Sequence, residues 1–271
     1  MIPSPSLNRR TFLQASTMAL AAGPAMAKEF KEQSLFNGKD LTGWHTNRTK
    51  VGHGTGGRWR VEDGAIIGEQ DPPGSGNGGL LLSDRKFGNF DLRLEMNPDW
   101  GPDSGVFFRC TEKCAGFQMY VDYHDRGNVG HLRGEMPGPF AAMPFNIYGN
   151  LKDNQLQSLR TEPDRRVKNW PAGVYQSTCT AADWLKAWKV GQWNTARIRC
   201  EGKYPVITTW INDLKVCHFD GARCTLPAYK KDHVLKTLGQ RGSIGLQVHG
   251  GKSWPKGAVV RWRNIRIKEL A

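Results

Sequence analysis

Signatures of several well-known enzyme classes are missing from this 271-residue chain, and each absence excludes something. Neither the His-Glu-x-x-His motif of zinc peptidases nor the Gly-x-Ser-x-Gly elbow of esterases occurs, so the sequence does not support a peptidase or an esterase. No Cys-x-x-Cys pair is present, which argues against a structural zinc cluster. Internal repeats and heptads are lacking too. After residue 27 no run of 18 apolar residues occurs, so we expect no membrane-spanning helix.

Acidic residues are fewer than basic residues in this chain. It has 25 Asp and Glu, 38 Lys and Arg, and a formal net charge of +13. Nucleic-acid binding proteins concentrate such charge on one face. Here the basic residues are scattered, and the two denser groups fall in an expected loop (165–168) and along one strand face (261–266). We therefore interpret them as solvated surface and expect no nucleic-acid partner.

The N-terminus carries an export pattern. Arg9 and Arg10 precede Phe12-Leu13, a mildly apolar stretch over 15–22 and a small-residue site at Ala25-Met26-Ala27. This order is typical of a twin-arginine (Tat) signal peptide that is removed after export. We expect residues 1–27 to be this signal and 28–271 to form a single domain, located in the periplasm or outside the cell.

Six cysteines remain after that signal, at positions 110, 114, 179, 200, 217 and 224. An even number in an oxidising compartment favours disulfides, although six cysteines allow fifteen pairings. Spacing alone suggests Cys110–Cys114 and Cys217–Cys224, which would leave Cys179–Cys200.

Alternating apolar and polar residues predict an all-β fold. The hairpin Trp59–Gly68 turns at Asp63-Gly64, and the stretch Phe90–Met96 alternates apolar and charged side chains. Further strands are predicted at 104–110, 118–124, 193–200, 206–210, 243–249 and 259–270. Ten to twelve antiparallel strands with so little helix indicate a sandwich or a jelly roll.

Two kinds of segment interrupt the strands. The stretch from about Gly127 to Tyr175 carries five prolines and little periodicity, and we expect it to be one long Pro-rich loop inserted in the sandwich, with a functional role. Short helices are predicted at Ala181–Val190 and Lys230–Leu238.

Seven segments in register resemble the 3-keto-disaccharide hydrolase domain family. They are Ser34-Leu-Phe-Asn-Gly-Lys-Asp-Leu-Thr-Gly-Trp44, Phe90-Asp-Leu-Arg-Leu-Glu95, Ser104-Gly-Val-Phe-Phe-Arg109, Gln192-Trp-Asn194, Trp210-Ile-Asn212, Gly245-Leu-Gln-Val-His-Gly250 and Arg263-Asn-Ile-Arg-Ile-Lys268. The resemblance runs from Ser34 to Leu270. It implies a concanavalin A-like jelly-roll β-sandwich that acts on 3-keto-glycosides, as a hydrolase or as a 1,2-lyase with hydratase activity. The chain departs from the family at Gln118 and Tyr120, where the family usually has Glu and Gln.

The implied reaction defines the groups to look for. A ketone at C3 acidifies the hydrogen on C2, so a base can remove it and the aglycone can leave C1 before water is added. This needs a base, an acid and a positive group or metal near the ketone oxygen. The polar strand faces offer Glu95, Arg109, Asp122 and His124 as catalytic candidates, with Arg109 on the enolate.

The same polar faces offer residues to bind the substrate, a saccharide or keto-saccharide. These candidates are Phe107, Gln118, Tyr120, Glu135, Trp210, Gln247 and His249. Metal ligands, if the positive group is a divalent metal ion, are to be sought among Asp122, His124 and His249. A lectin-like binding module on the same scaffold stays open as the alternative, favoured by the altered Gln118 and Tyr120. The whole hypothesis requires these side chains to converge in one cleft.

Overall fold

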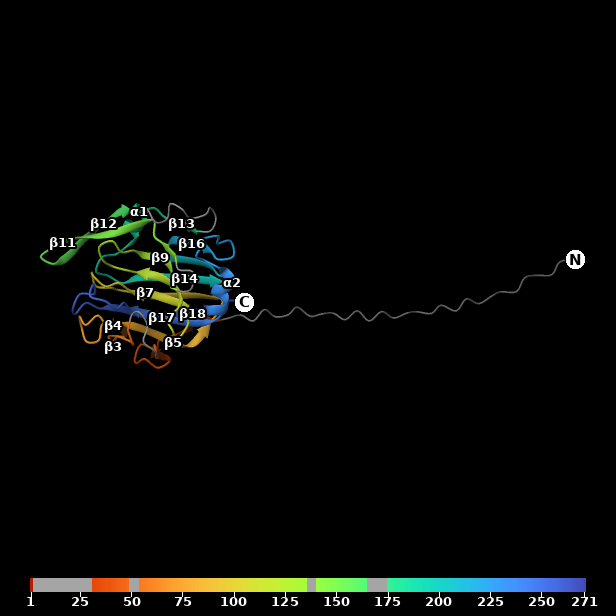
Figure 1. Ribbon diagram of the computed structural model, residues 1–271, viewed down its shortest axis with the longest axis horizontal. Helices are drawn as coiled ribbons and strands as arrows, with labels where there is room; N and C mark the ends of the chain where they lie inside the picture. Colours follow the sequence, from red (N-terminus) through yellow and green to blue (C-terminus); the bar gives the residue numbers. More distant parts are fainter. Residues whose placement is uncertain (2–30, 49–53, 136–139, 165–174) are drawn as a thin grey trace.

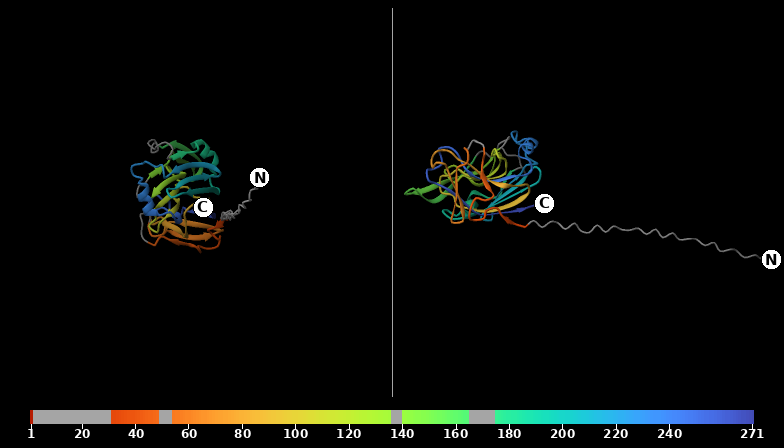
Figure 2. Two further views of the ribbon diagram at one scale, coloured as in Figure 1. Left: turned by 90° about the vertical axis from the view of Figure 1, so that its right-hand side faces the viewer. Right: turned by 90° about the horizontal axis from the view of Figure 1, so that it is seen from below.

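The computed structural model describes residue 1 and residues 31–48, 54–135, 140–164 and 175–271, which fold into two large antiparallel sheets packed face to face (Figures 1 and 2). Residues 2–27 of the predicted signal peptide and the basic group at 165–168 lie outside these residues. No helix within the described ranges is long and apolar enough to cross a membrane.

The described residues form three sheets. A nine-stranded sheet has the order β13 (Tyr175–Ser177), β16 (Leu214–Asp220), β15 (Val206–Ile211), β14 (Asn194–Glu201), β6 (Phe90–Met96), β18 (Val260–Glu269), β4 (Ala65–Glu69), β3 (Arg58–Glu62), with β1 (Gln33–Ser34) paired to β18. A seven-stranded sheet has the order β10 (Phe140–Ala142), β9 (Val129–Glu135), β8 (Gly116–Val121), β7 (Gly105–Cys110), β17 (Gly242–Val248), β5 (Gly79–Phe87), β2 (Trp44–Thr46). Strands β11 (Phe145–Lys152) and β12 (Gln155–Pro163) pair as a hairpin that projects from one end of the sandwich (Figure 1).

The core lies between the two large sheets because each strand turns its apolar face inward. On β6, Phe90, Leu92 and Met96 join the main buried cluster, while Arg93 is exposed and Glu95 is partly exposed on the outer face. On the opposite sheet, Val106 and Phe108 of β7 face the same cluster. Each such side chain contributes about 1.5–3 kcal/mol when it is fully buried. The alternation in the sequence therefore predicted which residues form the core.

Tight turns connect neighbouring strands where the sequence predicted them. Asp63 and Gly64 have φ values of 49° and 73° between β3 and β4, which fits the type I′ turn that hairpins favour. Asn212 and Asp213, with φ of 47° and 67°, turn the chain between β15 and β16. These turns fix the register of β3 with β4 and of β15 with β16.

The stretch from Gly127 to Tyr175 differs from its prediction as one long loop. Its described part contains β9, β10, β11 and β12. The prolines do not prevent strands from forming here, because they lie at strand ends. Pro144 stands between β10 and β11, and Pro163 is the last residue of β12. Strand β9 matters most for function because it adds polar side chains beside β8.

Both predicted helices are present and short. Helix α1 (Ala181–Ala187) begins with a capping box between Thr180 and Asp183, and its Trp184 is fully buried with the indole N–H donating to the Val129 carbonyl at 2.9 Å. Helix α2 (Lys231–Leu238) buries Val234 and Leu238. Helix α1 packs against β12 and β16.

All six cysteines are free thiols, so the expected disulfides are not formed. Cys110 and Cys114 lie close together as the spacing suggested, but the fold separates Cys179 from Cys200. Cys200 lies beside Arg109, whereas Cys179 lies beside Cys217 and not beside Cys200. Burial raises the pKa of Cys217 to about 12, which keeps this thiol neutral and unreactive.

Candidate functional site

One cleft on the outer face of the seven-stranded sheet gathers most of the predicted site residues. We call it the strand-end cleft, since it lies where β8 and β17 end, and its volume is about 240 Å³. It is lined by eight polar or ionisable residues: Asp103, Gln118, Tyr120, Asp122, Arg133, Glu135, Gln247 and His249. Five of these eight come from the strand faces that sequence alternation assigned to the outside. A cleft lined in this way can bind hydroxyl groups and transfer protons.

Two glutamine side chains form the floor of the cleft. The amide of Gln118 donates to Oε1 of Gln247 at 2.9 Å and to the Ser104 carbonyl at 3.3 Å, and both glutamines are nearly completely buried. Gly105 makes room for this arrangement, since a Cβ atom there would lie 2.1 Å from Nε2 of Gln118. The hydroxyl of Ser104 in turn donates to the Gln247 carbonyl at 2.6 Å. The floor is thus a rigid set of amide groups linking β7, β8 and β17.

The positive group of the cleft is Arg133 on β9. It pairs with Glu135 two residues along the same strand and contacts the Tyr120 hydroxyl at 3.5 Å. Burial alone lowers the pKa of Arg133, but Tyr120 and Glu135 outweigh burial and raise it above its ordinary value. Arg133 therefore stays charged, and its side chain is 40% exposed toward the cleft and solvent. A fixed cation of this kind can stabilise a developing oxyanion.

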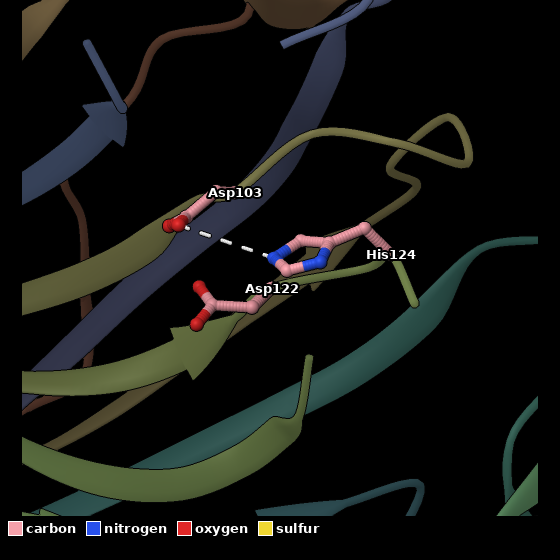
Figure 3. A group of neighbouring side chains, drawn as sticks. All are labelled: Asp103, Asp122 and His124. Atoms are coloured by element: carbon pink, nitrogen blue, oxygen red, sulfur yellow. Dashed lines mark ion pairs between the residues drawn. The ribbon is translucent and has the colours of Figure 1, made fainter. Parts of the chain in front are cut away.

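Beside the cleft, Asp103, Asp122 and His124 converge from the segments next to β7 and β8 (Figure 3). Backbone bonds align the two segments beyond the strands, with the Tyr123 N–H donating to the Pro102 carbonyl at 3.0 Å. Nε2 of His124 lies 3.9 Å from Oδ2 of Asp103. Burial, followed by the neighbouring Asp103 charge, raises the pKa of Asp122 well above its usual range. Two carboxyl groups this close, one of them buried, are an unusual arrangement for a merely structural patch.

His249 follows β17 and completes the rim of the cleft. Its backbone N–H donates to the Asp103 carbonyl at 3.3 Å, which ties β17 to the segment before β7. The ring Nδ1 faces the Gly250 carbonyl. Nδ1 therefore carries the hydrogen and Nε2 carries the lone pair. In this tautomer the imidazole can accept a proton at Nε2.

Glu95 does not lie in the cleft. It is on the outer face of the nine-stranded sheet, where Arg263 donates to it at 2.7 Å and Asn264 at 2.9 Å. Burial by itself raises the pKa of Glu95, but these two hydrogen bonds outweigh it and the pKa lies below its ordinary value. Trp210 lies on the same outer face, with Arg197 4.5 Å from its ring centre. The core separates both residues from the strand-end cleft.

Arg109 is also absent from the cleft, although alternation placed it on the outer face. Its φ of 46° takes the residue out of the regular strand conformation. The side chain is 1% exposed, and its guanidinium donates to the Gly202 carbonyl at 2.7 Å and to the Gly88 carbonyl at 3.3 Å. Arg109 therefore joins buried loop backbones and cannot reach a substrate.

Two further predicted positions are corrected. Phe107 faces outward with Gln118 but is completely buried against Leu80 and Leu82, so it offers no surface for a sugar ring. His124 does not line the cleft itself and contributes through the cluster with Asp103 and Asp122. His249 is not part of that cluster in the described chain.

Sequence reasoning missed Asp103 and Arg133. Asp103 stands one residue before the predicted strand at 104–110, a position where strand alternation gives no direction. Arg133 was hidden because the Pro-rich stretch was interpreted as loop, although Leu132-Arg133-Gly134-Glu135 alternates uncharged and charged residues. That alternation was the signal that could have identified Arg133.

The fold defines a class of protein, the concanavalin A-like jelly-roll β-sandwiches, and the cleft gives this one an ionisable site on one sheet. The model of the 3-keto-alpha-glucoside-1,2-lyase-like domain family matches residues 31–268. The chain belongs to this family, which confirms the resemblance noted in the sequence and supports a glycosyl hydrolase-like function.

Two relatives are consistent with this assignment. A 3-keto-disaccharide hydrolase of Bacteroides thetaiotaomicron is 26% identical over 257 residues, which cover 88% of this chain and 78% of that protein. The crystal structure of a proposed glycosyl hydrolase from Parabacteroides distasonis aligns with a TM-score of 0.51 at 18% identity, covering 89% of this chain and 94% of that one. At this identity the structural likeness supports the fold alone.

Proposed function

We propose that the chain cleaves 3-keto-glycosides in the strand-end cleft by elimination of the aglycone and addition of water. The observation that carries this proposal is the meeting of Arg133, Tyr120 and His249 in one cleft of a chain from this family. Together they provide a cation, a phenol and an imidazole, which are the kinds of group that the reaction requires.

Each group has a role in the proposed reaction. Nε2 of His249 takes the C2 hydrogen as a proton, and the electron pair forms an enolate whose oxygen is stabilised by the charge of Arg133. The enolate collapses, the C1–O bond breaks, and the departing oxygen receives the phenolic proton of Tyr120. Water then adds across the new C1–C2 double bond. Its oxygen bonds to C1 as the Tyr120 phenolate takes its proton, and C2 receives a proton from His249, whose ring proton has exchanged with solvent. The sum is hydrolysis of one glycosidic bond.

The amide floor binds the sugar without taking part in proton transfer. Gln118 and Gln247 are held by each other and by Ser104, so their orientation is fixed before substrate arrives. Such preorganised groups suit the hydroxyls of a pyranose ring. The cleft volume of about 240 Å³ is below the range of roughly 300–1,000 Å³ found for most ligand pockets. We infer that only the keto sugar enters and that the aglycone stays outside.

The experiment that tests this mechanism follows the hydrogen on C2. A 3-keto-disaccharide deuterated at C2 of the keto ring is incubated in ordinary water, and the released keto sugar is analysed by mass spectrometry. Elimination and hydration predict loss of the deuterium and a primary isotope effect on kcat/KM. Retained deuterium in the product together with no isotope effect would show direct hydrolysis, and binding without turnover would favour the lectin-like module. Incubation without enzyme corrects for spontaneous exchange.

We also propose that the protein is exported by the Tat pathway to the periplasm or beyond. The support is the sequence pattern of Arg9-Arg10, the short apolar stretch and the Ala25-Met26-Ala27 site. Replacing both arginines by lysine should leave the unprocessed chain in the cytoplasm, which cell fractionation detects. Unchanged export of that double variant would contradict the proposal.

A further inference from the structure

The cluster of Asp103, Asp122 and His124 has the dimensions of a metal site. One ligand atom from each residue lies within 4.8 Å of the other two, and Nε2 of His124 is 3.9 Å from Oδ2 of Asp103 (Figure 3). Atoms that share an ion at roughly 2.2 Å lie about 3 to 4.4 Å apart. The 3.9 Å pair is already within this range, and shortening the wider separations by up to about 1 Å would bring all three atoms onto one ion.

Unsatisfied polar atoms are concentrated in this cluster. Within the described residues, three buried side-chain nitrogen or oxygen atoms have no hydrogen-bond partner: Oδ1 of Asp122, Nε2 of His124 and Nε1 of Trp262. Two of the three belong to the cluster, and Asp122 is only 8% exposed. Leaving such atoms unpaired costs about 1–3 kcal/mol each. A cation at the centre would satisfy both atoms and would stabilise the charged form of Asp122 beside Asp103.

His124 is already oriented as a ligand. Its ring Nδ1 lies 2.8 Å from the Asp125 carbonyl, so Nδ1–H donates there and the lone pair is on Nε2. Metal-binding histidines are generally held in this way, by a carbonyl or carboxylate on the nitrogen that does not bind the ion. The nitrogen that faces Asp103 is therefore the one that can coordinate.

We propose that Asp103, Asp122 and His124 bind one divalent first-row transition ion. Two carboxylates together with one imidazole suit Mn²⁺, Fe²⁺ or Zn²⁺, because Ca²⁺ and Mg²⁺ prefer oxygen ligands alone. Three protein ligands leave open positions for water or substrate. Because Asp103 and Asp122 also line the strand-end cleft, the ion supplies a second positive charge near Arg133. That catalytic role depends on the proposed function, whereas the binding of the ion does not.

A second group of the same residue types shows what a satisfied cluster looks like. His45 lies between Asp84 and Glu112, with Nδ1 2.5 Å from Asp84 and Nε2 3.1 Å from Glu112. Both ring nitrogens have partners there, so this group is an ordinary surface ion pair. It provides a matched control on the same molecule.

The test is titration of the purified full chain with Mn²⁺ after removal of metals by EDTA. Electron paramagnetic resonance reports free Mn²⁺, and water proton relaxation reports open positions on bound Mn²⁺. We expect one saturable site per chain with enhanced relaxation. Asp122→Asn and His124→Gln should each weaken Mn²⁺ binding at least about tenfold. Mutation of residues that only hydrogen-bond to metal ligands already lowers metal affinity about 10–100-fold. The control Asp84→Asn should bind as the wild type does.

Absence of saturable Mn²⁺ binding up to millimolar concentration would overturn the proposal. Wild-type affinity in both Asp122→Asn and His124→Gln would also overturn it, and His124→Gln decides the matter if Asp122→Asn does not fold. These readouts need no substrate, so they stand even if no 3-keto-glycoside is cleaved. Conversely, the protein could bind no Mn²⁺ and still release the C2 deuterium. That result would support the proposed function and would overturn the proposed metal site.

Discussion

A single glycine determines whether the amide floor of the cleft can form. Gly105 lies beneath Gln118, and a Cβ atom there would be 2.1 Å from Nε2 and 2.6 Å from Cγ of that side chain. Gln118 is buried and has little room to move aside. Its bond to Gln247 therefore depends on the absence of a side chain at position 105.

We predict that Gly105→Ala lowers kcat/KM on a 3-keto-disaccharide about 100-fold, because displacement of a positioning group by about 1 Å can have this effect. Steady-state kinetics measure the change. Gly191→Ala serves as the control for an added methyl group, since nothing lies within 4 Å of a Cβ atom there, although its φ of 66° adds some strain. Equal kinetics for both variants would show that the amide floor does not position substrate.

The buried His131 gives the fold a defined response to acid. Its Nδ1–H donates to Asn128 at 2.8 Å, and burial lowers its pKa from 6.5 to about 3. In the unfolded chain the histidine titrates near 6.5, so between that pH and about 3 the unfolded state binds one more proton. The stabilisation is therefore complete above pH 6.5 and is lost as the pH falls.

We predict that His131 contributes a decline of up to about 1.4 kcal/mol in the free energy of unfolding per pH unit below 6. Urea unfolding between pH 7 and 4.5 measures it. His131→Gln is the matched variant, because an amide cannot titrate, and its curve should be flatter by that amount. Parallel curves for the two proteins would contradict the role of His131.

At the level of residues, alternation predicted side-chain direction well where the backbone is regular. Gln118, Tyr120 and Gln247 lie on the outer face as predicted and line the cleft. Arg109 does not, because its φ of 46° reverses the local geometry and no sequence pattern marks that angle. Phe107 has the predicted direction, yet covering segments bury it. The sequence therefore predicts the face of the strand to which a side chain points, but it does not predict whether other segments cover that side chain.

Among the elements, the hairpin between β15 and β16 depends on its first turn residue. The Asn212 side chain accepts a hydrogen bond from the Thr195 N–H at 2.8 Å and donates to the Ala187 carbonyl at 2.8 Å and to Asn194 at 2.7 Å. It thus joins the turn to β14 and to the end of α1. Asp213 shares the left-handed conformation, with φ of 67°.

We predict that Asn212→Ala destabilises the protein by about 2–4 kcal/mol, through lost hydrogen bonds and a backbone angle that alanine disfavours. Asp213→Gly should be neutral or slightly stabilising, because glycine suits the second position of such a turn. Chemical denaturation compares both variants with the wild type. A larger loss in Asp213→Gly than in Asn212→Ala would contradict this account of the turn.

Elements with strong periodicity were predicted correctly, and weak ones were not. Strand β6 has the predicted bounds Phe90–Met96, and both short helices are present. Strands β9 to β12 were missed because prolines and glycines interrupt each short alternation between residues 127 and 175. Their stability comes from pairing with β8 and with each other, which is tertiary information.

At the scale of the whole molecule, the order of the strands decides which polar faces meet. Glu95 and Gln118 both lie on the outer faces of their own strands, yet β6 pairs with β14 and β18 in one sheet while β8 pairs with β7 and β9 in the other. Their outer faces therefore point away from each other. Family resemblance predicted the sandwich, but local patterns could not assign a strand to a sheet.

The two outer faces carry comparable Arg–Glu pairs. Arg133 pairs with Glu135 above the seven-stranded sheet, and Arg263 pairs with Glu95 above the nine-stranded sheet. The two arginine side chains are 40% and 37% exposed. Replacing one or the other by methionine removes the same charge from opposite sides of the sandwich.

The most direct test of the site is kcat/KM of Arg133→Met and Arg263→Met on a 3-keto-disaccharide, with thermal unfolding to confirm that both variants fold. We predict a loss of about 100-fold or more for Arg133→Met, since one oxyanion-stabilising group is worth 10²–10³ in rate. Arg263→Met should stay within about threefold of the wild type. Full activity of Arg133→Met, or an equal loss in Arg263→Met, would contradict the location of catalysis in the strand-end cleft.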